Sequence, residues 1–163
     1  LMEELRGKAT NIIDTSKLSV KKFNDELKHI YSLSQGDNKT ISISVVSFGF
    51  KYGMPKDADM VFDVRFLPNP HYVGHLKDRT GQEEVVQNYI MKWPVANKFY
   101  DKLFDFISFL IPEYIKEGKS HLSIAIGCTG GQHRSVTTAI KLGEFIKSEE
   151  YRVVIKHRDI DKK

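Results

Sequence analysis

The sequence contains a single cysteine, Cys128, among its 163 residues. One thiol cannot build a disulfide framework or a multi-cysteine zinc site, so Cys128 is either a packed thiol or a reactive one. No run approaches the roughly 20 apolar residues that cross a bilayer, and the first residues lack the apolar segment of a secretory signal. The phosphate-loop pattern GxxxxGK[ST] is also absent, which argues against an NTPase. We therefore expect a cytoplasmic protein without a metal site or a membrane partner.

Charge of either sign is also unremarkable. The 25 Lys and Arg against 21 Asp and Glu give a formal net charge of +4, and 28% charged residues is ordinary for a solvated surface. This balance permits an acidic ligand or RNA without establishing either.

At 40% apolar residues, the chain can bury one core. It starts without Met and in mid-pattern, so we expect residues 1–10 to be a linker from a missing N-terminal part and residues 11–163 to form a single domain.

The most informative stretch is an apolar strand that ends at Cys128 and runs through a glycine-rich turn into a helix. The spacing C-x-x-G-x-x-R-S, with Gly131 and Arg134, requires a sharp turn. Backbone N–H groups converge in such a turn at a helix N-terminus, whose partial positive charge favours an anion. Thr129, His133 and Arg134 add side chains suited to a phosphate. We expect a phosphate-sized anion pocket; the alternative is a plain tight connection between strand and helix.

Two other strands end in polar side chains. A strand predicted over residues 40–48 is followed by Lys51, and one over residues 58–66 carries Asp63 and Arg65. Ligands of open α/β sheets gather at the carboxyl ends of strands, so Lys51 is a candidate anion partner, the alternative being a surface lysine. Asp63 and Arg65 lie on one face of their strand, where burial would demand a partner for each. They could pair with each other or with the loop that contains Arg134.

The loop after residue 66 contains two prolines, which fix the backbone before Asn69 and His71. A stiff loop that presents Asn and His at the end of a strand suits the positioning of a ligand. A lone histidine such as His71 is, however, more often an ordinary surface residue.

The rest of the chain alternates helices with strands. Helices are predicted over residues 19–33, 82–93, 94–116 and 134–148, and short strands over residues 11–16 and 151–156. The tail after residue 156 is predicted to be a solvated end. An apolar stripe of the third helix is predicted to be core: Val95, Phe99, Leu103, Phe106, Ile107 and Leu110. The alternation predicts an α/β domain with a mostly parallel sheet flanked by helices.

The spacing of Cys128 and Arg134 also matches that of cysteine-dependent phosphatases, in which a thiolate attacks phosphorus and an arginine clamps its oxygens. A helix N-terminus and an arginine would both lower the thiol pKa, as such a nucleophile needs. Gly127, however, stands where those enzymes usually carry histidine. Asp59 or Asp63 could supply the general acid only if the fold brings one of them near.

Three blocks of the sequence resemble the C-terminal domain of the RapZ/YvcJ family, the RNase adapter and P-loop nucleotide-binding proteins. They are Ser47-Phe-Gly-Phe-Lys51, Asp63-Val-Arg-Phe-Leu-Pro-Asn-Pro-His71 and Gly127-Cys-Thr-Gly-Gly-Gln-His-Arg-Ser-Val136, and the likeness extends from about residue 11 to the end of the chain. The resemblance implies a fold similar to a phosphofructokinase subdomain. It also implies self-association into a homo-oligomer and a missing N-terminal P-loop domain that binds ATP or GTP.

The same resemblance implies that this domain is a sensor, needs no cofactor and is not an enzyme. Its ligand would be glucosamine-6-phosphate or a related amino sugar such as UDP-N-acetylglucosamine, and its role the control of cell-envelope precursor metabolism. Enterobacterial members of the family bind a small RNA, present it to a ribonuclease and contact a two-component regulator.

Transferred to this chain, the resemblance implies a ligand site made of His71, Cys128, Thr129, Gly130, Gly131, His133 and Arg134, with Lys51, Asp63, Arg65 and Asn69 as further candidates. Arg134, Thr129 and the loop amides would hold the phosphate, and Asp63 or Asn69 would meet the sugar. Gln132 replaces a lysine common in enterobacterial members. The tail also lacks their dense basic cluster, which weakens the case for RNA because RNA binding depends on clustered Lys and Arg.

Overall fold

The structure is a computed structural model that describes residues 13, 15–16, 18–23 and 41–162. The chain divides into a unit of residues 1–38 and a unit of residues 39–163. In the first unit a helix starts at Val20, and the Ser19 hydroxyl accepts a hydrogen bond from the backbone N–H of Lys22 at 3.3 Å. Ser19 therefore caps this helix, as its residue type predicts.

Other predictions for the first unit are tested only in part. The predicted strand over residues 11–16 is absent at residues 13 and 15–16, the described members of that stretch. The rest of this strand, the proposed linker over residues 1–10 and residues 24–33 of the predicted helix lie outside the described residues.

The second unit is built on a four-stranded sheet. Its strands are β1 (Ser42–Gly49), β2 (Met60–Asp63), β3 (His121–Cys128) and β4 (Arg152–His157), in the order β2-β3-β1-β4. All three pairings are parallel, which confirms the predicted parallel α/β fold. β2 is shorter than predicted because the chain turns after Val64, whose carbonyl accepts a hydrogen bond from the Leu67 N–H at 3.2 Å.

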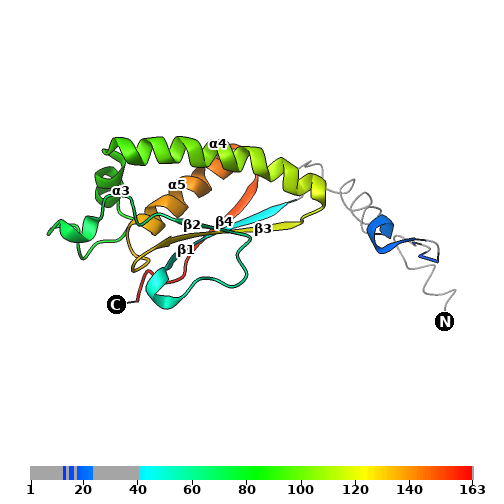
Figure 1. Cartoon of the computed structure of the whole chain (residues 1–163), viewed down its shortest axis with the longest axis horizontal. Coiled ribbons are helices and arrows are strands. Elements are labelled where there is room, and N and C mark those ends of the chain that lie inside the picture. Colours follow the sequence, from blue (N-terminus) through cyan, green and yellow to red (C-terminus); the bar gives the residue numbers. More distant parts are fainter. Residues whose placement is uncertain (1–12, 14, 17, 24–40, 163) are drawn as a thin grey trace, which may run out of the picture. The chain divides into compact units, whose positions relative to one another are not determined.

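Three helices complete this unit: α3 (Glu84–Met91), α4 (Pro94–Glu117) and α5 (Arg134–Ser148). Figure 1 shows them on the same side of the sheet, with α5 between the sheet and α4. The apolar residues of the strands, such as Ile43 and Ile124, pack in one core with Leu142 of α5 and Ile107 of α4. No helix among the described residues is long and apolar enough to span a membrane.

The predicted apolar stripe of α4 is only partly buried. Leu103 and Ile107 are in the core, but Val95 and Phe106 are each 47% exposed. The buried positions are Ala96, Tyr100, Leu103, Ile107 and Ile111. The two sets share Leu103 and Ile107, so the inward face is rotated from the predicted one by less than the roughly 100° of one residue step. As a result α4 exposes apolar side chains along a second face.

The tail after β4 is a solvated end only in part: Arg158, Asp161 and Lys162 are exposed, but Asp159 is not. Residues 158–161 form a turn, and the Asp159 side chain is fully buried. Its carboxylate accepts a hydrogen bond from the backbone N–H of Gly49, at the end of β1. A charge-rich tail therefore folds back against the end of the sheet.

Candidate anion-binding pocket

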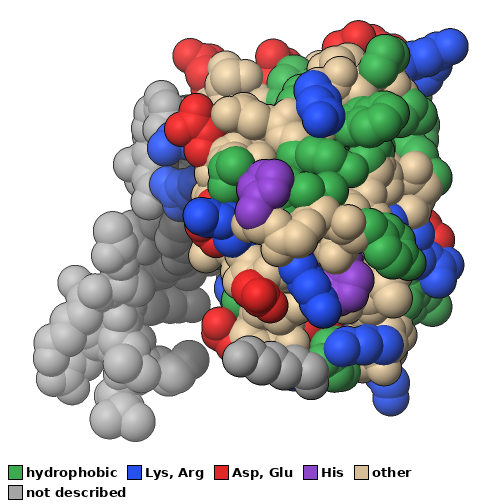
Figure 2. Space-filling model, turned by 90° about the vertical axis from the view of Figure 1, so that its left-hand side faces the viewer, with side chains coloured by type: hydrophobic (Ala, Val, Ile, Leu, Met, Phe, Trp, Pro, Cys, Tyr) green, Lys and Arg blue, Asp and Glu red, His purple; other side chains and the backbone are tan. Residues whose placement is uncertain are grey.

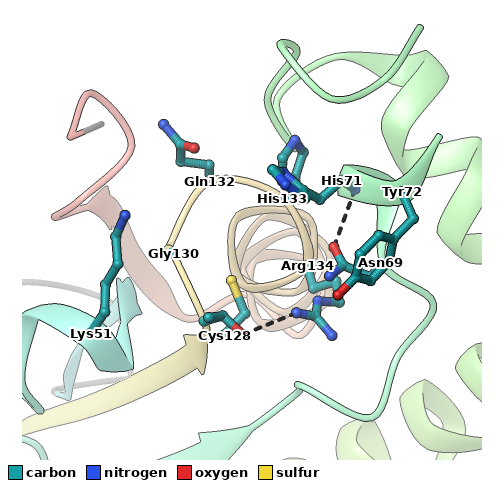
Figure 3. Close-up of a pocket in the computed structure, with 10 residues that line it drawn as sticks. Lys51, Asn69, His71, Tyr72, Cys128, Gly130, Gln132, His133 and Arg134 are labelled. Atoms are coloured by element: carbon teal, nitrogen blue, oxygen red, sulfur yellow. Dashed lines mark hydrogen bonds between the residues drawn. The ribbon is translucent and has the colours of Figure 1, made fainter. Parts of the chain in front are cut away.

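A pocket of about 340 Å³ opens where the strands end. Because the strands are parallel, the segments that follow β1, β2 and β3 all emerge at this end of the sheet. The lining residues are Lys51, Asn69, His71, Tyr72, Cys128, Thr129, Gly130, Gln132, His133 and Arg134. Figure 3 shows Lys51 on one side of the hollow and Asn69, His71 and Tyr72 on the other, with the loop after β3 between them. Figure 2 views this end of the molecule, where Lys, Arg and His side chains are visible.

The loop over residues 128–134 forms the floor of the pocket. Gly131 has φ 76°, a left-handed conformation that glycine adopts without strain. A Cβ atom on Gly131 would also lie 2.7 Å from the backbone nitrogen of Gly49, so a side chain has no room there. This tight turn lets α5 begin at Arg134 and places its N-terminus at the pocket.

Arg134 is 5% exposed, and its guanidinium is held at one end. Its Nη1 donates to the carbonyls of Arg65 and Leu67, and its Nη2 donates to Thr129 Oγ1 at 3.3 Å. Its Nε is buried and has no hydrogen-bond partner among the described residues. Burial lowers the pKa of Arg134, but an arginine keeps its charge near neutral pH. A buried cation in the lining of an open pocket suits an anion.

His133 precedes Arg134 and is 7% exposed. Burial lowers its pKa, although the carbonyls of residues 76, 77 and 79 oppose this, so the imidazole is neutral at pH 7. Its Nε2 is the second buried polar atom without a partner in the described part of the chain. The ring of His71 lies 6.5 Å away, centroid to centroid. A neutral histidine thus lines the pocket without adding charge.

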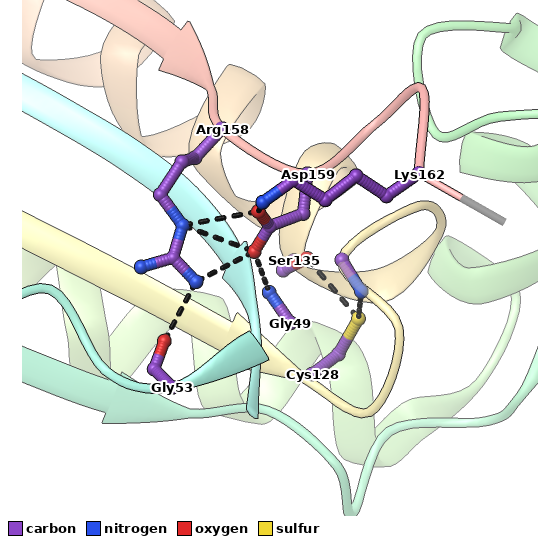
Figure 4. Close-up of polar contacts among 8 residues, drawn as sticks. Gly49, Gly53, Cys128, Ser135, Arg158, Asp159 and Lys162 are labelled. Atoms are coloured by element: carbon purple, nitrogen blue, oxygen red, sulfur yellow. Dashed lines mark hydrogen bonds and ion pairs between the residues drawn. The ribbon is translucent and has the colours of Figure 1, made fainter. Parts of the chain in front are cut away.

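The Cys128 sulfur is enclosed by the loop. Sγ accepts a hydrogen bond from the Gly131 N–H at 3.3 Å and lies 3.1 Å from Ser135 Oγ (Figure 4). The preceding residue, Gly127, faces two aromatic rings. A Cβ atom there would lie 2.5 Å from both Phe48 and Phe50, so the histidine of cysteine phosphatases does not fit this position.

Comparison with known proteins shows the family of the chain. Residues 41–161 match the family model of the RapZ C-terminal domain. The chain belongs to this family. It is 62% identical over 162 residues to a nucleotide-binding protein of Halothermothrix orenii, covering 99% of this chain and 57% of that protein. It is 50% identical over 159 residues to one of Moorella thermoacetica (98% and 52%) and 52% identical over 163 residues to one of Bacillus pumilus (100% and 54%). The chain thus spans little more than half the length of these relatives.

Most of the site residues implied by the RapZ resemblance line the pocket: Lys51, Asn69, His71, Cys128, Thr129, Gly130, His133 and Arg134. Gly131, Asp63 and Arg65 do not. Asp63 and Arg65 pair with each other, N to O at 2.6 Å, and both side chains are about half exposed rather than buried. The hydrogen bond from Arg65 lowers the pKa of Asp63. Arg65 reaches the site only through its carbonyl, which holds Arg134.

Two lining residues were missed by sequence reasoning about this RapZ domain. Tyr72 follows His71 directly, and its place on the short helix η2 (Pro70–Tyr72) brings it to the pocket mouth. Gln132 was noted only as a replacement for lysine. It sits within the anion loop itself, so its position in the motif was the available signal.

Proposed function

We propose that this chain is a regulatory ligand-binding domain that senses an amino-sugar phosphate. The ligand would be glucosamine-6-phosphate or a related amino sugar such as UDP-N-acetylglucosamine, and the role would be control of cell-envelope precursor metabolism. The observation that carries this proposal is the buried cation Arg134 in the lining of an open pocket.

The phosphate part of the ligand is supported by charge and by hydrogen-bond donors. Arg134 supplies a fixed cation, Thr129 a hydroxyl and Lys51 a second cation across the pocket. The N-terminus of α5 adds the partial positive charge of the helix. Burying an anion here pairs charges that would otherwise be desolvated alone, which favours binding.

The sugar part is supported by size and by the polar rim. The pocket lies within the range of about 300–1,000 Å³ that is common for small-molecule sites. Asn69, His71 and Tyr72 are placed to meet hydroxyl groups. None of the lining residues is Asp or Glu, so no carboxylate selects an amine. The choice of an amino sugar therefore rests on membership of the RapZ family.

A cysteine-dependent phosphatase is the second candidate. The hydrogen bond from the Gly131 N–H to Cys128 Sγ favours it, because such a donor would stabilise a thiolate. Against it, Gly127 has no room for a side chain, and no carboxylate lines the pocket to act as general acid. We expect no turnover of para-nitrophenyl phosphate. Turnover that disappears in Cys128→Ser would overturn the sensor proposal.

The wider role of the whole protein is also a proposal. We propose ATP or GTP binding by the part of the relatives that this chain does not cover, and their name, nucleotide-binding protein, supports it. We propose a homo-oligomer, and exposed Phe106 and Phe109 on α4 support it. Sedimentation analysis showing a monomer at micromolar concentration would contradict this.

RNA, a ribonuclease or a two-component regulator are the proposed downstream partners. Binding of RNA through phosphates would weaken steeply with salt, because counterions are released from the RNA. Binding that is insensitive to salt, or absent at low salt, would argue against an RNA role.

Calorimetric titration tests the proposed ligand. Glucosamine-6-phosphate, glucose-6-phosphate, inorganic phosphate and UDP-N-acetylglucosamine are compared on the same preparation. The proposal predicts tighter binding of glucosamine-6-phosphate than of inorganic phosphate. If phosphate binds equally well, the loop is a general anion cradle, and if none of the four binds, the proposed function is wrong for this chain.

A further inference from the structure

The turn over residues 158–162 lies against the loop that forms the floor of the pocket. The two are separate in sequence but share contacts at the end of β1. The Asp159 carboxylate is fully buried and accepts a hydrogen bond from the Gly49 N–H at 2.8 Å. Arg158 and Lys162 each approach it to 2.7 Å (Figure 4). The turn therefore centres on one buried carboxylate with three donors.

The same turn touches the loop directly at two places. A Cβ atom on Gly131 would lie 3.0 Å from Cβ of Asp159, so the two backbones are closely packed. The Gln132 side chain donates through Nε2 to the carbonyls of Ile160 and Lys162, at 3.1 Å and 3.0 Å. Packing and hydrogen bonds thus tie the loop to the turn.

The end of β1 closes the connection between turn and loop. A Cβ atom on Gly49 would lie 2.6 Å from the carbonyl carbon of Gly130, so Gly49 packs against the loop while its N–H is held by Asp159. The loop contains adjacent glycines, Gly130 and Gly131, which have more conformational freedom than other residues. Such a loop needs support from outside to keep its donors converged on one point.

We infer that Asp159 is a positioning residue for the anion loop, and that the turn over residues 158–162 acts as a clasp that keeps residues 128–134 in the binding conformation. Asp159 does not line the pocket. It acts through Gly49 and Gly131, while Gln132 provides a second attachment. Release of the clasp would allow the loop to open and would lower the affinity for the ligand. Because such coupling is reciprocal, ligand binding would stabilise the closed clasp by the same factor. The affinity part of this inference rests on the proposed function.

The loop can be followed without any ligand, because Cys128 is the chain's single cysteine and is buried in that loop. Its rate of labelling by a thiol reagent such as DTNB reports opening of the loop. Asp159→Asn removes the charge that Arg158 and Lys162 pair with, and should raise the labelling rate by about tenfold or more. Asp161→Asn, the same change at an exposed position two residues on, is the matched control and should leave the rate unchanged.

A second control separates the clasp from a general loss of stability. Tyr100→Phe removes a hydrogen bond between α4 and α5 that is distant in sequence from the clasp. The two variants are compared under conditions that give them the same free energy of unfolding. If Tyr100→Phe and Asp159→Asn then accelerate labelling equally, the role of Asp159 is merely structural and the inference is wrong. Should Asp159→Asn fail to fold, Gln132→Ala tests the second attachment. The labelling rate of Gln132→Ala must also exceed that of Asp161→Asn.

Affinity provides the last test. In calorimetry with glucosamine-6-phosphate, Asp159→Asn should bind about tenfold more weakly than the parent chain, and Asp161→Asn should bind equally well. Unchanged affinity in a variant with accelerated labelling would contradict the coupling. If the parent chain binds no ligand, the proposed function fails while the labelling experiment still decides whether the clasp exists.

Discussion

At the scale of single residues, the pocket depends on how Arg134 is held. Carbonyls of the segment after β2 accept hydrogen bonds from its Nη1, and its Nε has no partner in the part of the chain that the structure describes. These carbonyls come from a stretch that sequence reasoning valued for its charged side chains, Asp63 and Arg65. In the structure the two side chains form an ion pair with each other, and backbone carbonyls of this stretch hold Arg134.

Lys51 allows the phosphate site to be tested without disturbing this arrangement. It is exposed, lines the pocket and comes from the short helix η1 (Phe50–Tyr52). Lys51→Ala should weaken binding of glucosamine-6-phosphate by about 3–10-fold, because a charge-assisted contact to phosphate is lost, with no change in Tm. Lys56→Ala, an exposed lysine outside the pocket, is the control. Equal affinities of the two variants, measured by calorimetry, would remove Lys51 from the site.

The anion loop could be predicted from sequence because all of its determinants are local. A strand, adjacent glycines and a helix start within residues 124–135 place Cys128, Thr129 and Arg134 together whatever surrounds them. Asp159 could not be found in this way. Its partner Gly49 is 110 residues earlier, and a charged tail shows no sign in sequence that one of its carboxylates is buried.

At the scale of secondary-structure elements, α5 was predicted to its ends, whereas the buried face of α4 was not. α5 begins directly after the loop and its small residues pack against the sheet, so its local pattern determines its orientation. α4 packs on α5 as well as on the core, and it buries Tyr100 through a hydrogen bond from one helix to the other. The contact of Tyr100 with Thr138 is tertiary, and the spacing of apolar residues along one helix cannot predict it.

The bond between Tyr100 Oη and Thr138 Oγ1, 3.0 Å long, can be tested by stability. Burial raises the pKa of Tyr100 to about 12, although the hydrogen bond with Thr138 opposes this, so the phenol stays neutral near pH 7. Tyr100→Phe should lower the free energy of unfolding by about 1 kcal/mol, because Thr138 loses its buried partner. Urea denaturation measures this. Tyr72→Phe, with an exposed hydroxyl, should be neutral; a similar loss there would show that the helix-to-helix bond is not the cause.

At the scale of the whole molecule, the stability of the fold should depend on one buried charge. Burial alone would raise the pKa of Asp159, but hydrogen bonds from Arg158, Gly49 and Lys162 outweigh it and lower the pKa to about 2. An aspartate in an unfolded chain titrates near pH 3.9. Asp159 therefore contributes stability that is present above about pH 4 and is lost as the pH falls toward about 2.

The pH dependence should consequently differ between the parent chain and Asp159→Asn. Near pH 5 the parent should be more stable by about 2 kcal/mol, and near pH 2 most of this difference should be lost. Urea denaturation of both proteins across this range, with Asp161→Asn as control, measures the gap. A gap that stays constant with pH would mean that the carboxylate charge of Asp159 does not stabilise the fold.

The sheet as a whole offers a rival position for an anionic ligand. Parallel sheets are usually covered on both faces, but α3, α4 and α5 lie on the same one. On the sheet, a smaller hollow of about 160 Å³ is lined by side chains that include Ser42, His121, Arg152 and Lys156. Basic and hydroxyl groups there could also attract a phosphate. Net charge alone therefore does not determine where the ligand binds.

The location of bound glucosamine-6-phosphate in a crystal of the chain tests the central claim most directly. The account predicts that the phosphate lies in the loop over residues 128–134, in contact with Thr129 and with the guanidinium of Arg134. The sugar should face Asn69, His71 and Tyr72. A ligand bound instead between Ser42 and Arg152, with the loop at the end of β3 unoccupied, would contradict the account.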